Sequence, residues 1–203
     1  MLNIAVFCSG NGTNLQAIIN AIKTRKLKSV RISLVVSDNY KAYALEKAKK
    51  SGIKSIVVER DKFVTKSDFE REIIKHLKAE NTELVVLAGF MRILGSDLLA
   101  AYKNKILNIH PALLPSFKGA HGIKDAFDYG AKVTGVTVHF VDDKMDQGPI
   151  ILQEAVPIKE EDSLDSLEER IHKVEHKLYY KAIGLFAGGK IKISGRKVEV
   201  VKK

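Results

Sequence analysis

The chain has 203 residues, of which 45% are hydrophobic and 29% charged, and only four are prolines. This composition is typical of an ordinary globular protein and excludes a disordered or low-complexity chain. The formal net charge is +10, but the lysines are scattered among acids along helical segments. That pattern favours a solvated surface, or a positive field that attracts small anions, over binding of a nucleic acid.

The amino-terminal segment MLNIAVFCSG carries no basic leader, and its apolar run is too short for a signal-peptide core or a membrane span. We therefore expect a cytoplasmic protein that does not bind membranes. The single cysteine, Cys8, lies in this apolar run and is interpreted as a buried thiol without a catalytic role.

Apolar runs then alternate with helical patterns. Strands are predicted at 2–8, 30–37, 54–58, 83–89 and 106–109, and helices at 13–24, 42–51, from 67 onward and at 96–104. Ser67 and Glu70 have the spacing of a capping box for the third helix, and Ser96 can cap the fourth. Strands that alternate with helices predict an α/β fold: a Rossmann-like, mostly parallel twisted sheet with helices on both faces.

From Ala131 the pattern changes. Residues 133–141 and 149–158 alternate in polarity and are joined by an acidic turn, which predicts antiparallel strands toward the C-terminus. A long helix follows, and the segment 190–203 alternates about Gly195 as a hairpin does. The apolar stripe of the long helix consists of Leu164, Leu167, Ile171, Val174 and Leu178.

The loop Ser9–Asn14 follows the first strand and opens a helix. Its glycines let the backbone approach a ligand, and free amides at a helix N-terminus attract anions. Asn14 stands where a dinucleotide fingerprint has its third glycine, and no Walker lysine follows. We therefore expect a mononucleotide-type phosphate site, with a plain glycine turn capped by Thr13 as the alternative.

Asn108 and His110 lie two apart on a predicted strand, so their side chains project from the same face. Asp146 lies in the acidic turn 142–148. Acyl transfer to an amine needs donors for an oxyanion and a group that moves the proton of the amine. An amide, an imidazole and a carboxylate fit those roles, although a strand-end histidine and an acidic turn can also be purely structural.

Other chemistries fit less well. The sequence has no Gly-x-Ser-x-Gly nucleophile elbow. His172 and His176 are four apart, but the glutamate between them does not stand in the zincin order, so no metal is expected.

Four segments together resemble the phosphoribosylglycinamide formyltransferase family, within the folate-dependent formyltransferase superfamily: SGNGTNLQ at 9–16, AGFMRIL at 88–94, NIHPALLPSFKG at 108–119 and VTVHFVDDKMDQGPIILQ at 136–153. The resemblance is collinear over nearly the whole chain. It implies direct transfer of the formyl group of 10-formyltetrahydrofolate to the amine of glycinamide ribonucleotide in purine biosynthesis. Asn108, His110 and Asp146 are then the catalytic residues.

The resemblance also implies two sets of binding residues. The ribonucleotide set comprises Gly12, Thr13, Asn14 and Glu175, and the folate set comprises Lys66, Met91, Arg92, Ile93, Leu94, Val141, Asp142 and Asp143. Two positions depart from the family pattern. Gln147 replaces a frequent second glycine after the aspartate, and His172 replaces a frequent Lys or Gln.

The predicted organisation is one domain over 1–203: a nucleotide-phosphate-binding half at about 1–100, a folate-binding and catalytic half at about 101–189, and the hairpin at about 190–203. Small-molecule substrates are expected as the partners of a monomer or homodimer. Two alternatives stay open: another folate formyl transferase or formyl-folate hydrolase, and a non-catalytic mononucleotide-binding module.

Overall fold

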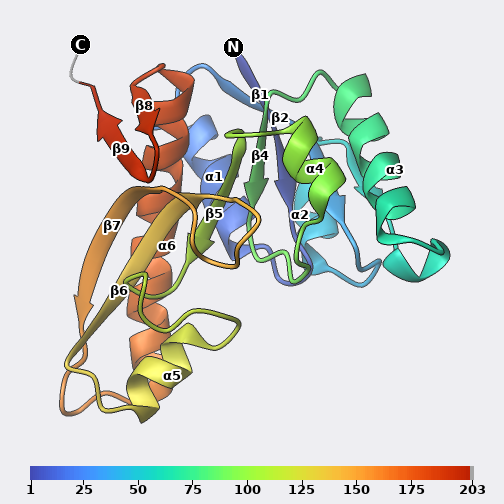
Figure 1. Ribbon diagram of the computed structural model, residues 1–203. Coiled ribbons are helices and arrows are strands. Elements are labelled where there is room, and N and C mark those ends of the chain that lie inside the picture. Colours follow the sequence, from blue (N-terminus) through green and yellow to red (C-terminus); the bar gives the residue numbers. More distant parts are fainter. Residues whose placement is uncertain (202–203) are drawn as a thin grey trace. The chain divides into compact units, whose positions relative to one another are not determined.

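The computed structural model describes residues 1–201, over which strands and helices alternate for most of the chain (Figure 1). In chain order the elements are β1 (Leu2–Phe7), α1 (Thr13–Lys23), β2 (Val30–Ser37), α2 (Tyr43–Lys50), β3 (Ser55–Val57), the 3-10 helix η1 (Arg60–Lys62), α3 (Lys66–Ala79), β4 (Leu84–Leu87), α4 (Ser96–Ala101), β5 (Ile106–His110), α5 (Gly122–Asp128), β6 (Val133–Phe140), β7 (Ile150–Pro157), α6 (Leu164–Ala187), β8 (Ile191–Ser194) and β9 (Lys197–Val200).

Seven of the strands form one sheet in the order β3-β2-β1-β4-β5-β6-β7. β1 pairs in parallel with β2 and β4, and β2 pairs in parallel with β3, whereas β6 and β7 are antiparallel. The predicted α/β fold, with antiparallel strands toward the C-terminus, is therefore confirmed. The chain divides into two compact units, one of residues 1–107 and one that begins at Asn108, and each is described by itself below. The predicted assignment of a separate function to each half stays a prediction.

The core of the first unit is built on its parallel strands. Residues Ile4–Phe7 of β1 and Leu84–Val86 of β4 are fully buried, because strands of a parallel sheet are covered on both faces. Leu15 and Ile18 of α1 and Leu77 of α3 are also fully buried. Cys8 directly follows β1 with no exposed surface, and burial raises the pKa of its thiol to about 12. This confirms its interpretation as a buried thiol.

The helix starts of the first unit differ from the prediction. Thr65, not Ser67, caps α3, with its hydroxyl oxygen accepting the backbone N–H of Asp68 at 3.0 Å. The carboxylate of Glu70 does not close a capping box. It is 2% exposed and accepts backbone N–H groups of Gly95 and Leu98, so that it caps α4 in place of Ser96. The predicted capping box is wrong because the nearby Thr65 caps α3, and the predicted Ser96 cap is wrong because Glu70, distant in sequence, accepts the amides at the start of α4.

The start of α1 also differs. Its N-cap is Gly12, with φ of 66°, and no side chain caps the helix. Thr13 is the first helical residue rather than the cap.

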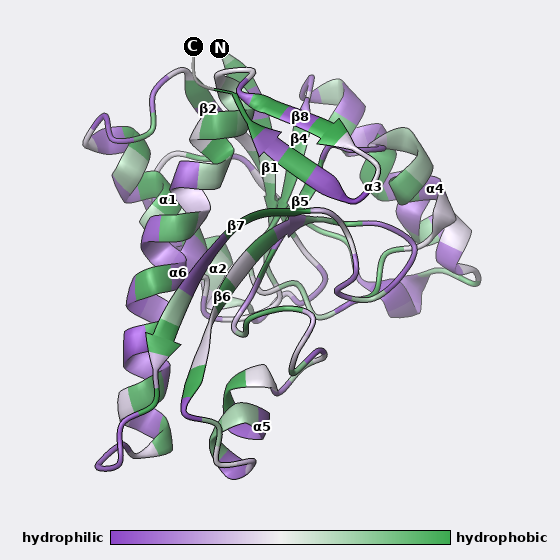
Figure 2. Cartoon of the chain, turned by 60° about the vertical axis from the view of Figure 1, so that its left-hand side comes forward, coloured by the Kyte–Doolittle hydropathy of each residue, from purple (hydrophilic) through white to green (hydrophobic). Residues whose placement is uncertain are grey.

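The second unit is built from β6, β7 and the long helix α6, which packs on both strands. Leu167, Ile171 and Leu178 are buried as the predicted stripe requires, while Leu164 and Val174 are half-buried. Figure 2 shows hydrophilic and hydrophobic residues alternating along α6, as an amphipathic helix requires. Helix α5 was not predicted, since residues 112–130 carry no clear periodicity.

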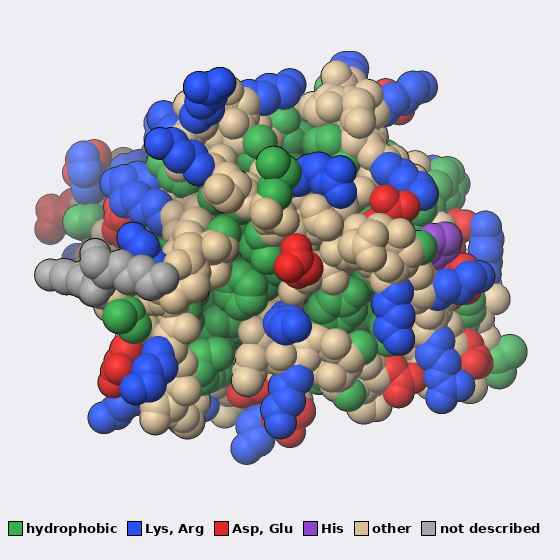
Figure 3. All heavy atoms as spheres, turned by 90° about the horizontal axis from the view of Figure 1, so that it is seen from above, with side chains coloured by type: hydrophobic (Ala, Val, Ile, Leu, Met, Phe, Trp, Pro, Cys, Tyr) green, Lys and Arg blue, Asp and Glu red, His purple; other side chains and the backbone are tan. Residues whose placement is uncertain are grey.

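Strands β8 and β9 pair around Gly195, which has φ of 59°. The predicted hairpin is therefore confirmed within residues 190–201, and residues 202 and 203 of the predicted range lie outside the described part. On the face seen in Figure 3, Lys and Arg side chains are spread among acidic ones rather than gathered into one patch. Across residues 1–201, no helix combines the length and apolar character needed to cross a membrane.

Candidate active site

Asn108 and His110 lie among the last three residues of β5. Ile106, Leu107 and Ile109 of this strand are buried, and His110 is itself only 4% exposed. The two-residue period of the strand places Asn108 and His110 on one face, as predicted.

The imidazole of His110 is held from one side by the loop that follows. Its Nε2 lies 2.7 Å from the backbone carbonyl oxygen of Phe117. Because a carbonyl can only accept, Nε2 carries a proton and donates it. A Cβ on Gly122 would lie 3.2 Å from this same nitrogen, so a glycine at the start of α5 leaves room for the ring.

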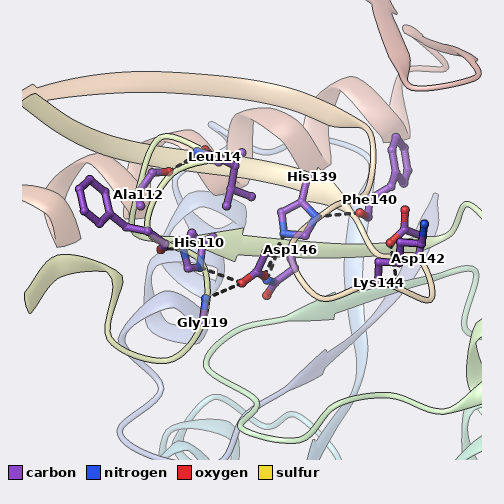
Figure 4. A network of polar contacts seen from close by, with 12 residues as sticks. His110, Ala112, Leu114, Gly119, His139, Phe140, Asp142, Lys144 and Asp146 are labelled. Carbon is purple, nitrogen blue, oxygen red and sulfur yellow. Dashed lines mark hydrogen bonds and ion pairs between the residues drawn. The ribbon is translucent and has the colours of Figure 1, made fainter. Parts of the chain in front are cut away.

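Asp146 faces the other ring nitrogen. Its Oδ2 lies 3.7 Å from Nδ1 of His110 and accepts the backbone N–H of Gly119 at 2.9 Å (Figure 4). Asp146 has φ of 52°, a left-handed conformation that Asp tolerates better than most residues. Its side chain is 11% exposed, so the carboxylate is largely shielded from water.

A second histidine, His139, completes the cluster and was not among the predicted site residues. Its Nδ1 lies 2.7 Å from the carbonyl oxygen of Phe140, so Nδ1 carries a proton. Burial is the main cause that lowers the pKa of His139, which favours the neutral ring with a lone pair on Nε2. That lone pair accepts Nδ2–H of Asn108 at 3.3 Å.

The amide of Asn108 is therefore oriented, with its nitrogen toward His139. Nε2 of His139 also lies 3.7 Å from Oδ1 of Asp146, but a neutral ring forms no ion pair with that carboxylate. No local signal in the sequence marked His139, because its partner Asn108 lies 31 residues away along the chain.

The predicted phosphate loop lies in the first unit. A Cβ on Gly12 would stand 2.7 Å from Cβ of Ala44, so both the backbone angle and the packing of α2 require glycine there. Thr13 is exposed, and Asn14 is 8% exposed. Nζ of Lys47 lies 3.3 Å from the carbonyl oxygen of Gly12, which places a cation at this loop.

The predicted folate residues fall in three places. Lys66 is an exposed residue at the start of α3, and Met91–Leu94 form a loop after β4 in the first unit. Nε of Arg92 donates to Oδ2 of Asp38 at 2.5 Å. Val141, Asp142 and Asp143 lie in the turn after β6 in the second unit.

Glu175 is a buried residue of α6, only 5% exposed. One carboxylate oxygen lies 2.8 Å from Nδ1 of His172, and this bond is the main cause that raises the pKa of His172. His172, which departs from the family pattern, therefore gives Glu175, the predicted substrate-binding carboxylate, a titratable hydrogen-bond partner. Among residues 1–201, no group of three or more His, Cys, Asp or Glu side chains could hold a metal ion.

The chain is similar to known formyl transferases. The formyl transferase family profile matches residues 2–183. Phosphoribosylglycinamide formyltransferase of Bacillus subtilis is 45% identical over 93% of this chain and 96% of its own length, and that of Escherichia coli is 41% identical over 95% and 90%. The crystal structure of glycinamide ribonucleotide transformylase 1 from Symbiobacterium toebii superposes with a TM-score of 0.96 at 42% identity, covering 100% of this chain and 95% of that one. The chain therefore belongs to the formyl transferase family, in the branch of the phosphoribosylglycinamide formyltransferases.

Proposed function

We propose that this chain transfers the formyl group of 10-formyltetrahydrofolate to the amine of glycinamide ribonucleotide. The relatives named for this reaction match nearly the full chain. The single observation that carries the chemistry is the cluster of an oriented amide, a proton-bearing imidazole and a shielded carboxylate at Asn108, His110 and Asp146.

In the proposed reaction the amine nitrogen attacks the formyl carbon. A new C–N bond forms, and negative charge develops on the formyl oxygen of a tetrahedral intermediate. One hydrogen of the Asn108 amide is directed at His139, and the other donates to this oxyanion. The Nε2–H of His110 leaves its hydrogen bond with the carbonyl oxygen of Phe117 and donates to the same oxyanion instead. Such donors stabilise the charge most in a site shielded from water.

Asp146 orients His110 when Nδ1 of the ring also carries a proton, and it accepts the proton that the attacking amine loses, directly or through water. The intermediate collapses by breaking the bond between the formyl carbon and N10 of the folate, and N10 takes up the proton that Asp146 received from the amine, directly or through water. The products are formylglycinamide ribonucleotide and tetrahydrofolate, and no covalent bond to the enzyme is needed. Holding both substrates in place supplies a large further part of the rate enhancement.

Binding is proposed to follow the two residue sets. Gly12, Thr13 and Asn14 present helix N-terminal amides to the ribonucleotide phosphate, and Glu175 binds the glycinamide end. The exposed apolar side chains of Met91 and Ile93 suit an aromatic ring system, while Lys66 and Arg92 suit the acidic tail of the folate. Val141, Asp142, Asp143 and Leu94 complete the folate set.

The test is a spectrophotometric assay of tetrahydrofolate formation from 10-formyltetrahydrofolate, with and without glycinamide ribonucleotide. Product that depends on glycinamide ribonucleotide is the expected result. Product without any acceptor indicates a hydrolase, and product only with methionyl-tRNA or an amino sugar nucleotide indicates another transferase. Binding of glycinamide ribonucleotide without turnover in every arm indicates a non-catalytic mononucleotide-binding module. Each of these three outcomes contradicts the proposal.

A further inference from the structure

The loop from Ala88 to Gly95, which follows β4, has an unusual distribution of side chains. Phe90 packs edge-on against Phe7, with ring centroids 5.2 Å apart. Its neighbours Met91 and Ile93 instead expose 76% and 66% of their surfaces. Large apolar side chains held in water mark a surface that something covers. The loop has no strand or helix of its own, so other groups must fix its backbone.

Near its middle the loop is held by the carboxylate of Asp38, whose side chain is only 8% exposed. One oxygen accepts the hydroxyl of Ser9 at 2.6 Å, and the other accepts Nε–H of Arg92 at 2.5 Å. The hydroxyl oxygen of Ser9 in turn accepts the backbone N–H of Met91 at 3.0 Å. Two consecutive loop residues therefore depend on one carboxylate.

At its C-terminal end the loop is held by the carboxylate of Glu70, which is 2% exposed. Its two oxygens accept the backbone N–H groups of Gly95 and Leu98. A Cβ on Gly95 would lie 2.7 and 2.9 Å from these oxygens, so the glycine is needed for the close approach. Neither carboxylate belongs to the predicted binding residues.

We propose that Asp38 and Glu70 are positioning residues that fix the middle and the C-terminal end of the Ala88–Gly95 loop and thereby preorganise it for the folate co-substrate. The inference rests on the proposed function, since it takes this loop as part of the folate site. A binding loop that is already ordered before the ligand arrives binds more tightly, because ordering the loop on binding weakens affinity. Buried charge-assisted hydrogen bonds are strong enough to provide that order.

The substitutions are chosen to separate charge from shape. Asp38→Asn keeps an oxygen that can accept from Ser9 but removes the charge that holds Arg92, and Asp38→Ala removes both. Glu70→Gln leaves one acceptor oxygen and turns an NH2 group toward a backbone donor. Glu80→Gln is the matched control. Glu80 directly follows α3, the helix that carries Glu70, and forms an ion pair with the exposed Lys54.

Steady-state kinetics with each substrate varied in turn provide the first readout. For Asp38→Ala and Glu70→Gln, we expect the KM for 10-formyltetrahydrofolate to rise about tenfold, from the loss of one charge-assisted bond. The KM for glycinamide ribonucleotide and kcat should stay within about threefold, and Asp38→Asn should fall between Asp38→Ala and the wild type. An unchanged folate KM overturns the proposal, and so does an equal rise in both KM values.

Hydrogen exchange provides a second readout that needs no substrate. In the absence of ligand, amides between Ala88 and Leu98 should exchange about tenfold faster in Asp38→Ala and Glu70→Gln than in the wild type or Glu80→Gln. Unchanged exchange contradicts the proposal. If the wild type itself shows no turnover, the proposed function fails. Wild-type turnover combined with unchanged folate KM and exchange in the variants contradicts only the role of Asp38 and Glu70.

Discussion

Nδ1 of His110 lies 3.7 Å from Oδ2 of Asp146. This is longer than a hydrogen bond but within reach of an ion pair once the ring carries a second proton. The same oxygen accepts the N–H of Gly119, so the carboxylate is held in place before any substrate binds. Catalytic contacts that are long without a ligand commonly shorten in the reacting complex.

The charge of Asp146 can be removed with little change of shape by Asp146→Asn. The amide oxygen can still accept from Gly119, and Asn tolerates the left-handed backbone of this position. We expect kcat to fall about 100-fold or more, a loss of the size found for removal of one catalytic electrostatic group, with both KM values nearly unchanged. Steady-state kinetics measure this, with Asp128→Asn at an exposed pair as the control. A variant with near-normal kcat would exclude Asp146 from the chemistry.

The role assigned to His139 is tested by pairing His139→Phe with His139→Gln. The phenyl ring keeps the volume but leaves the amide of Asn108 and the carbonyl of Phe140 without partners, each costing about 1–3 kcal/mol when buried. We expect kcat to fall about tenfold in His139→Phe through loss of the Asn108 orientation. The glutamine variant should recover part of that loss, because it offers an oxygen to Asn108. Equal kcat in the two variants would contradict an orienting role.

The two perturbed histidines predict opposite responses of stability to pH. Burial lowers the pKa of His139, so its contribution is present above the ordinary value of 6.5 and is lost as pH falls through the folded pKa. The bond to Glu175 raises the pKa of His172, so its contribution is fully present below 6.5 and is lost as pH rises through the folded pKa.

Denaturant unfolding at pH 5 and pH 8 checks these signs. His172→Gln should lose more stability at pH 5 than at pH 8. His139→Gln should flatten the decline of wild-type stability on acidification. A His172→Gln variant that is destabilised mainly at pH 8 would show that the pairing with Glu175 does not hold in solution.

Local pattern predicted most of the secondary structure but not the supporting contacts of the site. The shared face of Asn108 and His110 follows from strand periodicity alone, and the alternation of strands and helices was sufficient to predict the α/β fold. Glu70 shows the limit of this approach. Its spacing from Ser67 satisfies a local motif, yet its carboxylate binds amides of Gly95 and Leu98, as many as 28 residues away.

Asp38 and His139 were missed for the same reason. Asp38 meets Arg92 across 54 residues, and His139 meets Asn108 across 31. No short-range spacing encodes such pairs, because they depend on which loops and strands the sheet order brings together. The resemblance predicts which residues bind the substrates, whereas the side chains that contact those predicted residues, such as Asp38 and His139, became visible only in the structure.

Replacement of Gly148 by alanine should cause a severe steric clash. A Cβ at this position would lie 1.7 Å from the carbonyl oxygen of Phe140, a backbone atom that a side-chain rotation cannot move. We expect Gly148→Ala to destabilise the protein by about 3 kcal/mol or more, at the upper end of overpacking effects. It should also lower kcat, because the turn that carries Asp146 must shift. Gly10→Ala is the control for stability, since nothing lies within 4 Å of its Cβ position. Comparable unfolding midpoints for the two variants would contradict this reasoning.

The thiol of Cys8 should be unreactive in the folded protein. Cys8 directly precedes Ser9, which belongs to the hydrogen-bond network that holds the Ala88–Gly95 loop. Its pKa of about 12 leaves on the order of one thiolate in ten thousand at pH 8, and the side chain has no exposed surface. Iodoacetamide should therefore leave the native protein unmodified and fully active, and should label the thiol once urea unfolds the chain. Cys8→Ala should keep kcat within about twofold and lose about 1 kcal/mol of stability from the smaller side chain. Mass spectrometry of the native protein measures the labelling. Rapid labelling of the native protein with loss of activity would show that the end of β1 opens to solvent. That result would contradict the claim that Ser9 is held in a fixed position.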